Sequence, residues 1–487
     1  MALTALTALT ALTALTSVAG ANGRPAATAS INFRQGDPSH ILAGLTFGLI
    51  RSDDNGVTWK WMCEKAVGYA GTYDPDYAYA PSGAIFATTF EGLTALRPPS
   101  EGGDSCTFAA EPSGSVFVSA VEAGSGSVFY AAADPTDGNI YKSTDDGVSF
   151  QLSGAPGKAN DWWDSMMVSG DGTRTYVTGY RFNKQCNAAS TNAGATCTAE
   201  LDCLGSGAHH CDAVKEFLLY YKDNGATSYV TMPKGIITTS NSSVIDVVGI
   251  DHTSKNIVYV KATLESGTLG DSIYKSIDSG QTWTKILTTT DNFGLSFVVK
   301  QDGVMIASTV TSGSQISTAK AACTNPTSCA WTALASSPHI NCLTENPTTH
   351  EVWACTRNYD SPGITMDGYG IMKLDATNTT WSGVMHYQDI KGPVDCPSGT
   401  AQHDQCVQSY SGMPSVWCCL REQLGITDTS IDCTGANSCN VAGDGASDAG
   451  TTMVTAPKGC CNTGGGGAGA LGLAIGTGAL LWRRRRT

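Results

Sequence analysis

The sequence is short of charged residues, and of basic residues in particular. Only 15% of its 487 residues are charged, whereas roughly 25% is usual in soluble proteins. Lysine and arginine together number 29 against 43 acidic residues, which gives a formal net charge of −14. Because nucleic-acid-binding proteins need a basic face to neutralise phosphates, this balance argues against nucleic acid as a partner.

Helical periodicity is also missing from most of the chain. Between residues 31 and 384 no long segment carries apolar residues at helical spacing. Short runs rich in β-branched and aromatic residues occur instead, separated by Gly, Asp and Asn. Since 41% of the residues are hydrophobic, the sequence predicts an all-β globular protein rather than a disordered chain or a coiled coil.

Metal-binding and nucleophilic motifs are scarce. The chain has eight histidines, and no two of its 18 cysteines have the Cys-x₂-Cys spacing of a zinc ribbon. We therefore expect no metal site and no cofactor, and we expect disulfides, which indicate export to an oxidising compartment. The expected bonds are Cys342–Cys355, Cys323–Cys329, Cys63–Cys106 and two within residues 183–215.

A short motif recurs along the chain. Residues 52–59 read Ser-Asp-Asp-Asn-Gly-Val-Thr-Trp, residues 276–283 keep the same Ser, Asp, Gly, Thr and Trp, residues 143–150 differ conservatively, and residues 222–227 form a weaker copy. The Asp can accept backbone N–H bonds in a tight turn, the Gly allows a positive φ, and the aromatic ring can fill the space between two sheets. The residues expected to be structural for this reason are Asp54, Gly56, Trp59, Asp145, Gly147, Phe150, Asp223, Gly225, Asp278, Gly280 and Trp283.

This motif resembles the Asp-box (BNR) repeat of β-propellers such as sialidases, sortilin-type receptors and xyloglucan hydrolases. Weaker copies lie between the clear ones, so that seven units follow one another, each with three strands before the motif and one after it. Propeller blades take roughly 40–50 residues. The resemblance implies an all-β, seven-bladed propeller of four-stranded blades over residues 30–385, with an insertion at residues 183–215.

The segments that flank the repeats differ from them in composition. Residues 1–29 contain an Ala-Leu-Thr repeat and a small-x-small site at Ala19 and Ala21, but no basic residue precedes Arg24. They are therefore either a signal peptide or a low-complexity leader. Residues 386–439 form a cysteine-rich segment expected to pack beneath the propeller or to cap it, and residues 440–459 read as a linker.

The last segment, residues 460–487, combines two adjacent cysteines, a Gly-rich spacer, an apolar run and four arginines. At about 1.5 Å per residue the apolar stretch is just long enough to cross a bilayer as a helix, and the arginines would hold its end in the cytoplasm. The pattern resembles the MYXO-CTERM tail of myxobacterial surface proteins, which implies a processed sorting signal with Cys460 or Cys461 as the lipid-attachment site. A plain transmembrane anchor is the alternative, and both interpretations predict a protein held at the cell envelope.

Ligands of propellers usually meet the face built from the loops between second and third strands and from the connections between blades. The run Asp161-Trp162-Trp163-Asp164 enters the fourth blade there, and aromatic faces can stack on sugar rings while carboxylates accept sugar hydroxyl bonds. Because side chains alternate along a strand, the two tryptophans do not point the same way, and inter-blade packing is the competing role. The candidate ligand-binding residues are Trp162, Trp163, Asp164, Arg181, Phe47, Phe90, Glu91 and Tyr359.

Catalytic residues are harder to find. Sialidases use three converging arginines and a Tyr–Glu pair, which the few arginines of this chain do not suggest. Carboxylates at the channel mouth could act as general acid and base, as in xyloglucan hydrolases, and the weak candidates are Asp137, Asp164 and Asp360. The sequence favours a non-catalytic module that binds a glycan or an envelope or extracellular protein, with a glycoside hydrolase as the alternative.

Overall fold

The computed structural model describes residues 26–433 with internal gaps. The gaps are residues 70–73, 112–116, 125–126, 133–137, 155, 159–160, 206–209, 238, 265–269, 290–293, 310–312, 320–322, 326, 357–366 and 410–414. The predicted signal peptide, linker and tail, with Cys460 and Cys461, lie outside the described residues. Within the described part, no helix is long and apolar enough to cross a membrane.

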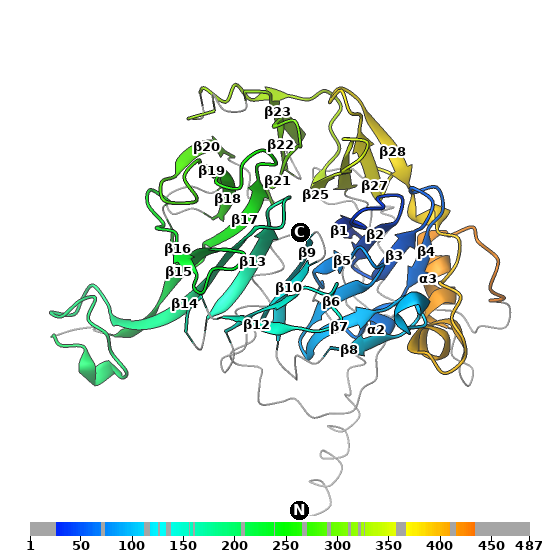
Figure 1. The fold of residues 1–487 in the computed structure, drawn as a ribbon, viewed down its shortest axis with the longest axis horizontal. Helices are drawn as coiled ribbons and strands as arrows, with labels where there is room; N and C mark the ends of the chain where they lie inside the picture. The colour runs from blue at the N-terminus through cyan, green and yellow to red at the C-terminus, as the bar shows by residue number, and fades with distance from the viewer. Residues whose placement is uncertain are drawn as a thin grey trace, which may run out of the picture.

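Seven antiparallel sheets of four strands each stand around a central axis (Figure 1). In every sheet the strands are neighbours in sequence order. The predicted seven-bladed propeller of four-stranded blades is therefore confirmed.

The blades follow one another along the chain. Blade 1 is β1 (Thr28–Phe33), β2 (Ile41–Leu45), β3 (Gly48–Ser52) and β4 (Lys60–Met62), and blade 2 is β5 (Tyr77–Tyr79), β6 (Ile85–Thr89), β7 (Gly92–Leu96) and β8 (Phe108–Ala110). Blade 3 is β9 (Val118–Gly124), β10 (Ser127–Ala132), β11 (Ile140–Ser143) and β12 (Gln151–Gly154), and blade 4 is β13 (Trp162–Val168), β14 (Arg174–Cys186), β15 (Cys211–Asp223) and β16 (Val230–Thr231). Blade 5 is β17 (Val244–Ile250), β18 (Val258–Thr263), β19 (Ser272–Ser276) and β20 (Thr284–Thr288), and blade 6 is β21 (Ser296–Val299), β22 (Met305–Thr309), β23 (Gly313–Ser317) and β24 (Thr332–Ala333). Blade 7 is β25 (Ile340–Glu345), β26 (Val352–Thr356), β27 (Ile371–Leu374) and β28 (Trp381–Met385).

The hydrophobic core is divided among the spaces between neighbouring blades. Phe86 of blade 2 meets Phe150 of blade 3 edge to face, with 6.1 Å between the ring centroids. Trp163 of blade 4 packs in one cluster with Phe129 and Ala131 of blade 3. Such clusters hold each blade against the next, because a sheet buries each apolar face only by meeting another sheet.

The turn between the third and fourth strands is built around an aspartate in the clear motif copies. In blade 3 the carboxylate of Asp145 accepts hydrogen bonds from the backbone N–H of Ser149 (2.9 Å) and from the hydroxyl of Ser143 (2.6 Å), and Gly147 has a φ of 85°. Asp54 and Asp278 accept the same set of bonds. These carboxylates therefore act within the turns that join the two strands.

Asp223, in the weaker copy, does something else. Its carboxylate accepts a bidentate pair of bonds from Arg174 at 2.9 and 2.8 Å and contacts Lys255 at 2.9 Å. Since Lys255 precedes the second strand of the next blade, this carboxylate joins two blades.

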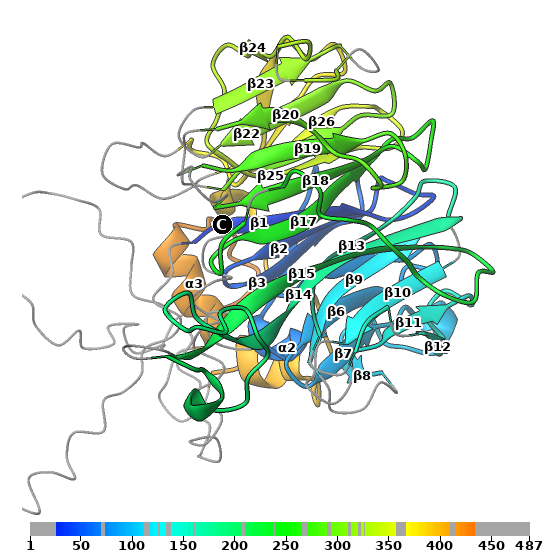
Figure 2. The same cartoon turned by 90° about the vertical axis from the view of Figure 1, so that its left-hand side faces the viewer.

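The strand order defines two faces. We call the upper face the one that carries the hairpins between second and third strands and the starts of the first strands, and the lower face the one that carries the remaining hairpins and the aspartate turns. The β14–β15 hairpin and helix α3 (Val416–Leu424) project from the upper face (Figure 2), at opposite edges of the ring (Figure 1).

The ring closes without a strand shared between its first and last blades. Strand β1 packs against β25 and β26 of blade 7, and the hydroxyls of Thr28 and Tyr387 are 3.0 Å apart. The chain then runs alongside β4, the outer strand of blade 1, where Trp61 donates to Gly392 (3.0 Å) and Val394 donates to Trp61 (2.8 Å). The segment that follows the last blade is thereby hydrogen-bonded to the first blade.

Two disulfides make this closure covalent. Cys63 of blade 1 is bonded to Cys406, and Cys106 of blade 2 is bonded to Cys396. The expected Cys63–Cys106 bond is therefore wrong, because the cysteine-rich segment comes between the two blades and bonds to each. The same segment lies against the outer edge of blade 1, where Gln402 donates to the carbonyl of Trp61 at 3.0 Å, rather than beneath the ring.

The other disulfides are local. The expected Cys323–Cys329 and Cys342–Cys355 bonds and two bonds in the insertion are confirmed, and Cys418–Cys433 ties α3 to the following residues.

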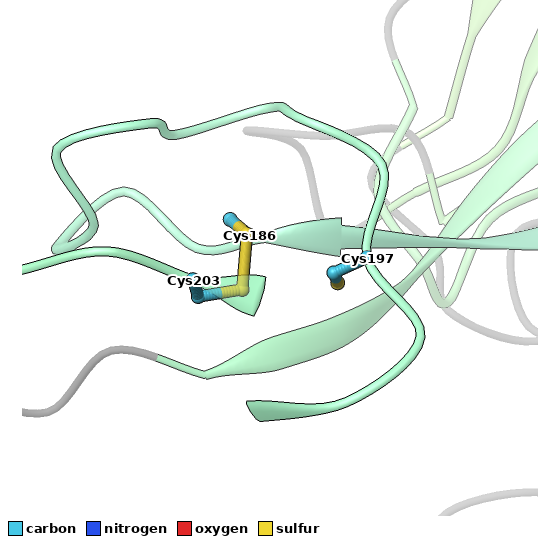
Figure 3. Close-up of side chains that lie close together, drawn as sticks. All are labelled: Cys186, Cys197 and Cys203. Carbon is cyan, nitrogen blue, oxygen red and sulfur yellow. A yellow bond between two sulfur atoms is a disulfide. The ribbon is translucent and has the colours of Figure 1, made fainter. Parts of the chain in front are cut away.

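The insertion in blade 4 lengthens β14 and β15 into an arm. Its tip is held by Cys186–Cys203 and Cys197–Cys211. The sulfurs of Cys186, Cys197 and Cys203 lie within 4.8 Å of one another (Figure 3). All three belong to disulfides, so this cluster fastens the tip.

The two closing disulfides can be tested by loop entropy. The two bonds are nested, because Cys106 and Cys396 both lie between Cys63 and Cys406 in the sequence. While one bond is present, the other closes only a loop of roughly 50 residues in the unfolded chain, made of the segments between the paired cysteines. We expect Cys63→Ala/Cys406→Ala or Cys106→Ala/Cys396→Ala to lower the free energy of unfolding by about 2–5 kcal/mol. We expect the quadruple variant to lose about 1–2 kcal/mol more than the sum of the two. Urea unfolding followed by tryptophan fluorescence measures this.

The matched control is Cys323→Ala/Cys329→Ala, whose bond spans a sequence separation of only six residues. A larger loss from this control than from either closing pair would contradict the role of loop length.

The aspartate turns predict a pH dependence. Hydrogen bonds from Ser143 and Ser149 lower the pKa of Asp145 to about 2. Its ionised form therefore contributes stability above the unfolded value of about 4, and this contribution is lost as the pH falls toward 2. We expect Asp145→Asn to be about 1 kcal/mol less stable than the wild type at pH 7 and equally stable near pH 2. Urea unfolding from pH 2 to pH 7 tests this. The control is Asp212→Asn on the exposed arm, which should be as stable as the wild type over the whole range.

Candidate functional site

Five aromatic rings form a continuous row on the upper face across blades 2 to 4. Phe90, in the β6–β7 turn, stacks on Phe117 with 5.1 Å between centroids, and Phe117 lies 6.0 Å from Trp162 at the start of β13. Trp162 is parallel to Tyr180 within 10° at 6.5 Å, and Tyr180 meets Phe182 edge to face at 5.4 Å. We call these five residues the aromatic row.

The row is partly open to solvent. Phe90 is 48% exposed and Phe182 is 53% exposed, whereas Phe117 and Trp162 between them are half-buried. Large apolar side chains with this exposure, joined into one feature, mark an interaction surface rather than scattered surface residues.

The rings are held in place by charged side chains. The ammonium group of Lys215 lies 3.9 Å from the centroid of the Tyr180 ring and donates to the carbonyl of Ser243 at 2.7 Å. Arg181, between Tyr180 and Phe182, binds the fully buried Asp161 with two hydrogen bonds of 2.8 and 2.9 Å. Since the backbone N–H of Lys158 also donates to Asp161, the segment that enters blade 4 is fastened to β14.

The structure separates the sequence-based candidates. Trp162 and Phe90 belong to the aromatic row, and Arg181 supports it through Asp161. Trp163 is buried and donates to the carbonyl of Gly138 at 2.8 Å, as the alternation of side chains required. Phe47 is also buried, edge-on to Tyr387, so it stabilises the ring closure and is not exposed to a ligand.

The carboxylate candidates are less informative. Glu91 is exposed next to Phe90, and Asp164 is half-buried at an irregularity of β13. Asp137, Tyr359 and Asp360 lie outside the described residues.

Sequence reasoning missed Phe117, Tyr180 and Phe182, and it noted Asp161 beside the tryptophans without its burial or its pairing with Arg181. Tyr180 and Phe182 are two positions apart on one strand, and such residues share one face of the sheet. The sequence therefore contained a signal that these two rings lie together. Nothing local marks Phe117, whose contact with Phe90 and Trp162 arises only when three blades stand side by side.

Two carboxylates beside the row, Asp161 and Glu216, are engaged by basic or amide groups. Asp161 is neutralised by Arg181, and Glu216 accepts a hydrogen bond from Asn183 at 2.7 Å and lies 3.8 Å from Arg181. A glycosidase acid must protonate a leaving oxygen within a cleft, which a buried, bidentately bound carboxylate does not reach. Asp161 is therefore poorly placed to act as such an acid.

A second concave region lies at the lower end of the central channel. This cavity of about 350 Å³ is lined by the first strands of all seven blades. Glu122 of β9 lines it, and its carboxylate makes no hydrogen bond with any residue that the structure describes. Burial raises the pKa of Glu122 to about 8, and the nearby Asp76 carboxylate acts in the same direction.

Glu122 predicts an alkaline weakening of the fold. The pKa of Glu122 in the folded protein lies above the unfolded value of about 4.3. The contribution of Glu122 to the free energy of unfolding is therefore fully present below pH about 4.3 and is lost as the pH rises through about 8. We expect Glu122→Gln to become more stable than the wild type as the pH is raised from 5 to 9. Thermal unfolding across this range measures it. Glu91→Gln, on the exposed β6–β7 turn, is the control, and the same pH trend in that variant would contradict the assignment.

No known family profile matches the chain, and no curated protein matches it. Among solved structures it is similar to the extracellular domain of a one-component system from B. thetaiotaomicron, with 11% identity, a TM-score of 0.43, and coverage of 69% of this chain and 38% of the other. It is also similar to the Dos1 propeller, with 11% identity, a TM-score of 0.41 and coverage of 75% and 85%. YCF48 from Cyanidioschyzon merolae has 12% identity, a TM-score of 0.39 and coverage of 60% and 82%. The chain's own sheet order makes it a seven-bladed β-propeller.

Proposed function

We propose that the chain is an exported β-propeller of the Asp-box class that binds a glycan on its upper face without cleaving it. The aromatic row carries this proposal. Exposed rings at its two ends, Phe90 and Phe182, flank the half-buried Trp162. The exposed rings of Phe90 and Phe182 offer contact surfaces to an extended ligand at the two ends of the row.

The chemistry of the row favours sugar rings. Aromatic faces take apolar sugar faces in stacking contact, and polar groups at the rim accept or donate hydrogen bonds to hydroxyls. Glu91 and Glu216 are exposed carboxylates at opposite parts of the row. The engagement of Asp161 by Arg181 supports binding over hydrolysis, since it removes the carboxylate nearest to Trp162 from acid–base work.

The location is supported by the covalent structure. The seven disulfides whose two cysteines both lie in the described residues are typical of a protein that folds in an oxidising compartment outside the cytoplasm. The aspartate turns support membership of the Asp-box class. Attachment to the envelope through residues 460–487, with Cys460 or Cys461 modified, remains part of the proposal on the strength of the sequence pattern alone.

The test is affinity electrophoresis of the purified full chain in gels that contain single polysaccharides. We expect at least one polysaccharide to retard the wild type, and we expect Phe90→Ala and Phe182→Ala each to weaken binding about tenfold, since a stacked aromatic contributes on the order of 1.5 kcal/mol. Both side chains are largely exposed, so these variants should keep their fold.

Ile277→Ala is the matched control, because Ile277 is 66% exposed on the lower face. Reducing-sugar release is measured on the same panel and should be absent. Release of sugar that is lost in Asp164→Asn would establish the hydrolase instead. Equal retardation of all three variants would remove the aromatic row as the binding surface.

A further inference from the structure

A polar pocket lies on the lower face between the outer parts of blades 3 and 4. It has a volume of about 210 Å³ and is lined by β11, β12 and β15 and by the turns that follow β13 and β15. The pocket is separate from the aromatic row, which lies on the upper face, and from the cavity of the central channel.

Two lysines converge on this pocket from different blades. Lys142 of β11 donates to the side-chain carbonyl of Asn224 at 2.7 Å, and its ammonium group lies 5.2 Å from the centroid of the Phe129 ring. Lys222 of β15 donates to the backbone carbonyl of Ser153, and its ammonium group lies 5.3 Å from the centroid of the Tyr229 ring. Both lysines therefore bond only to neutral oxygens within the part of the chain that the structure describes.

The lysine charges are not balanced by the carboxylate that lines the pocket. Asp223 is bound bidentately by Arg174 and contacts Lys255, so its charge is already shared between two cations. Burial lowers the pKa of both lysines, and for Lys142 the charge of Lys222 acts in the same direction. Lys142 and Lys222 therefore line one pocket without a carboxylate partner among the described residues.

Polar side chains complete the lining. Thr144, Gln151 and Thr175 face the pocket, and their side chains make no hydrogen bond with the described residues. These groups can donate to and accept from ligand hydroxyls, and the volume is that of a small organic molecule rather than of a single ion.

We propose that this pocket binds the acidic group of a sugar, a carboxylate or a sulfate ester, between Lys142 and Lys222. Each ammonium group has donor hydrogens beyond the one that it gives to Asn224 or to Ser153, so both can reach one oxyanion. Thr144, Gln151 and Thr175 then contact the hydroxyls of the ring. The assignment does not depend on the aromatic row, because it rests on a different face and on different residues.

The test is isothermal titration calorimetry of the full chain at constant ionic strength with sodium glucuronate, glucose 6-sulfate and glucose. We expect saturable binding of at least one acidic sugar and none of glucose. Lys142→Met and Lys222→Met keep the length of the side chain without its charge, and each should weaken binding at least about tenfold, because a hydrogen bond to a charged group contributes about 1.5–3 kcal/mol. The acidic probe that binds identifies the carboxylate or the sulfate as the preferred group.

Two variants serve as controls. Lys60→Met removes an exposed lysine of β4 and should bind as the wild type does. Phe182→Ala should also bind the acidic sugar normally, which separates this site from the proposed glycan surface. Equal binding of glucose and the acidic sugars, equal binding by Lys222→Met and the wild type, or the failure of both acidic sugars to bind overturns the proposal.

A second measurement is independent of the variants' affinity. Because the two lysines repel each other without a counter-ion, Lys142→Met and Lys222→Met should unfold at a higher temperature than the wild type in low salt. Added glucuronate or glucose 6-sulfate should raise the unfolding temperature of the wild type but not that of either variant. A wild type whose unfolding temperature is unchanged by both acids contradicts the proposal.

Discussion

The closure of the ring is the constraint on which the other contacts of this propeller depend. Six of the blade interfaces join blades that follow one another in the chain, but the seventh joins Thr28 to Tyr387, which are 359 residues apart. Bringing such distant segments together carries a large loop-closure entropy. No strand crosses this interface, and the cysteine-rich segment takes over the task by hydrogen-bonding to β4 and forming disulfides with blades 1 and 2.

The closed ring then separates the two faces by function. Aspartate turns, repeated at the lower outer edge, satisfy their own backbone groups and contribute the same local structure to several blades. The hairpins of the upper face differ in length, from the short β6–β7 turn with Phe90 to the long β14–β15 arm. The upper-face loops are not required to hold the propeller together, so their sequences can vary and can carry binding residues.

Positive charge is scarce in this chain, and most of it is assigned to particular partners. Arg181 neutralises Asp161 beneath the aromatic row, Arg174 binds Asp223 across the back of blade 4, and Lys215 covers the ring of Tyr180. Lys142 and Lys222 line one pocket from neighbouring blades, and each donates to a neutral oxygen rather than to a carboxylate. Their place in one pocket distinguishes them from the arginines, which are paired with carboxylates.

The sequence by itself determined the blade architecture, the aspartate turns and the local disulfides, because each depends on residues only a few positions apart. Ser143, Asp145 and Gly147 fold their turn from within, and Cys342 faces Cys355 as soon as two neighbouring strands pair. Only the tertiary structure decided which cysteines close the ring, that Phe117 joins Phe90 to Trp162, and that Lys142 meets Lys222. These contacts link different blades, and no periodicity or spacing along the chain specifies which side chains become neighbours once seven sheets are packed in a circle.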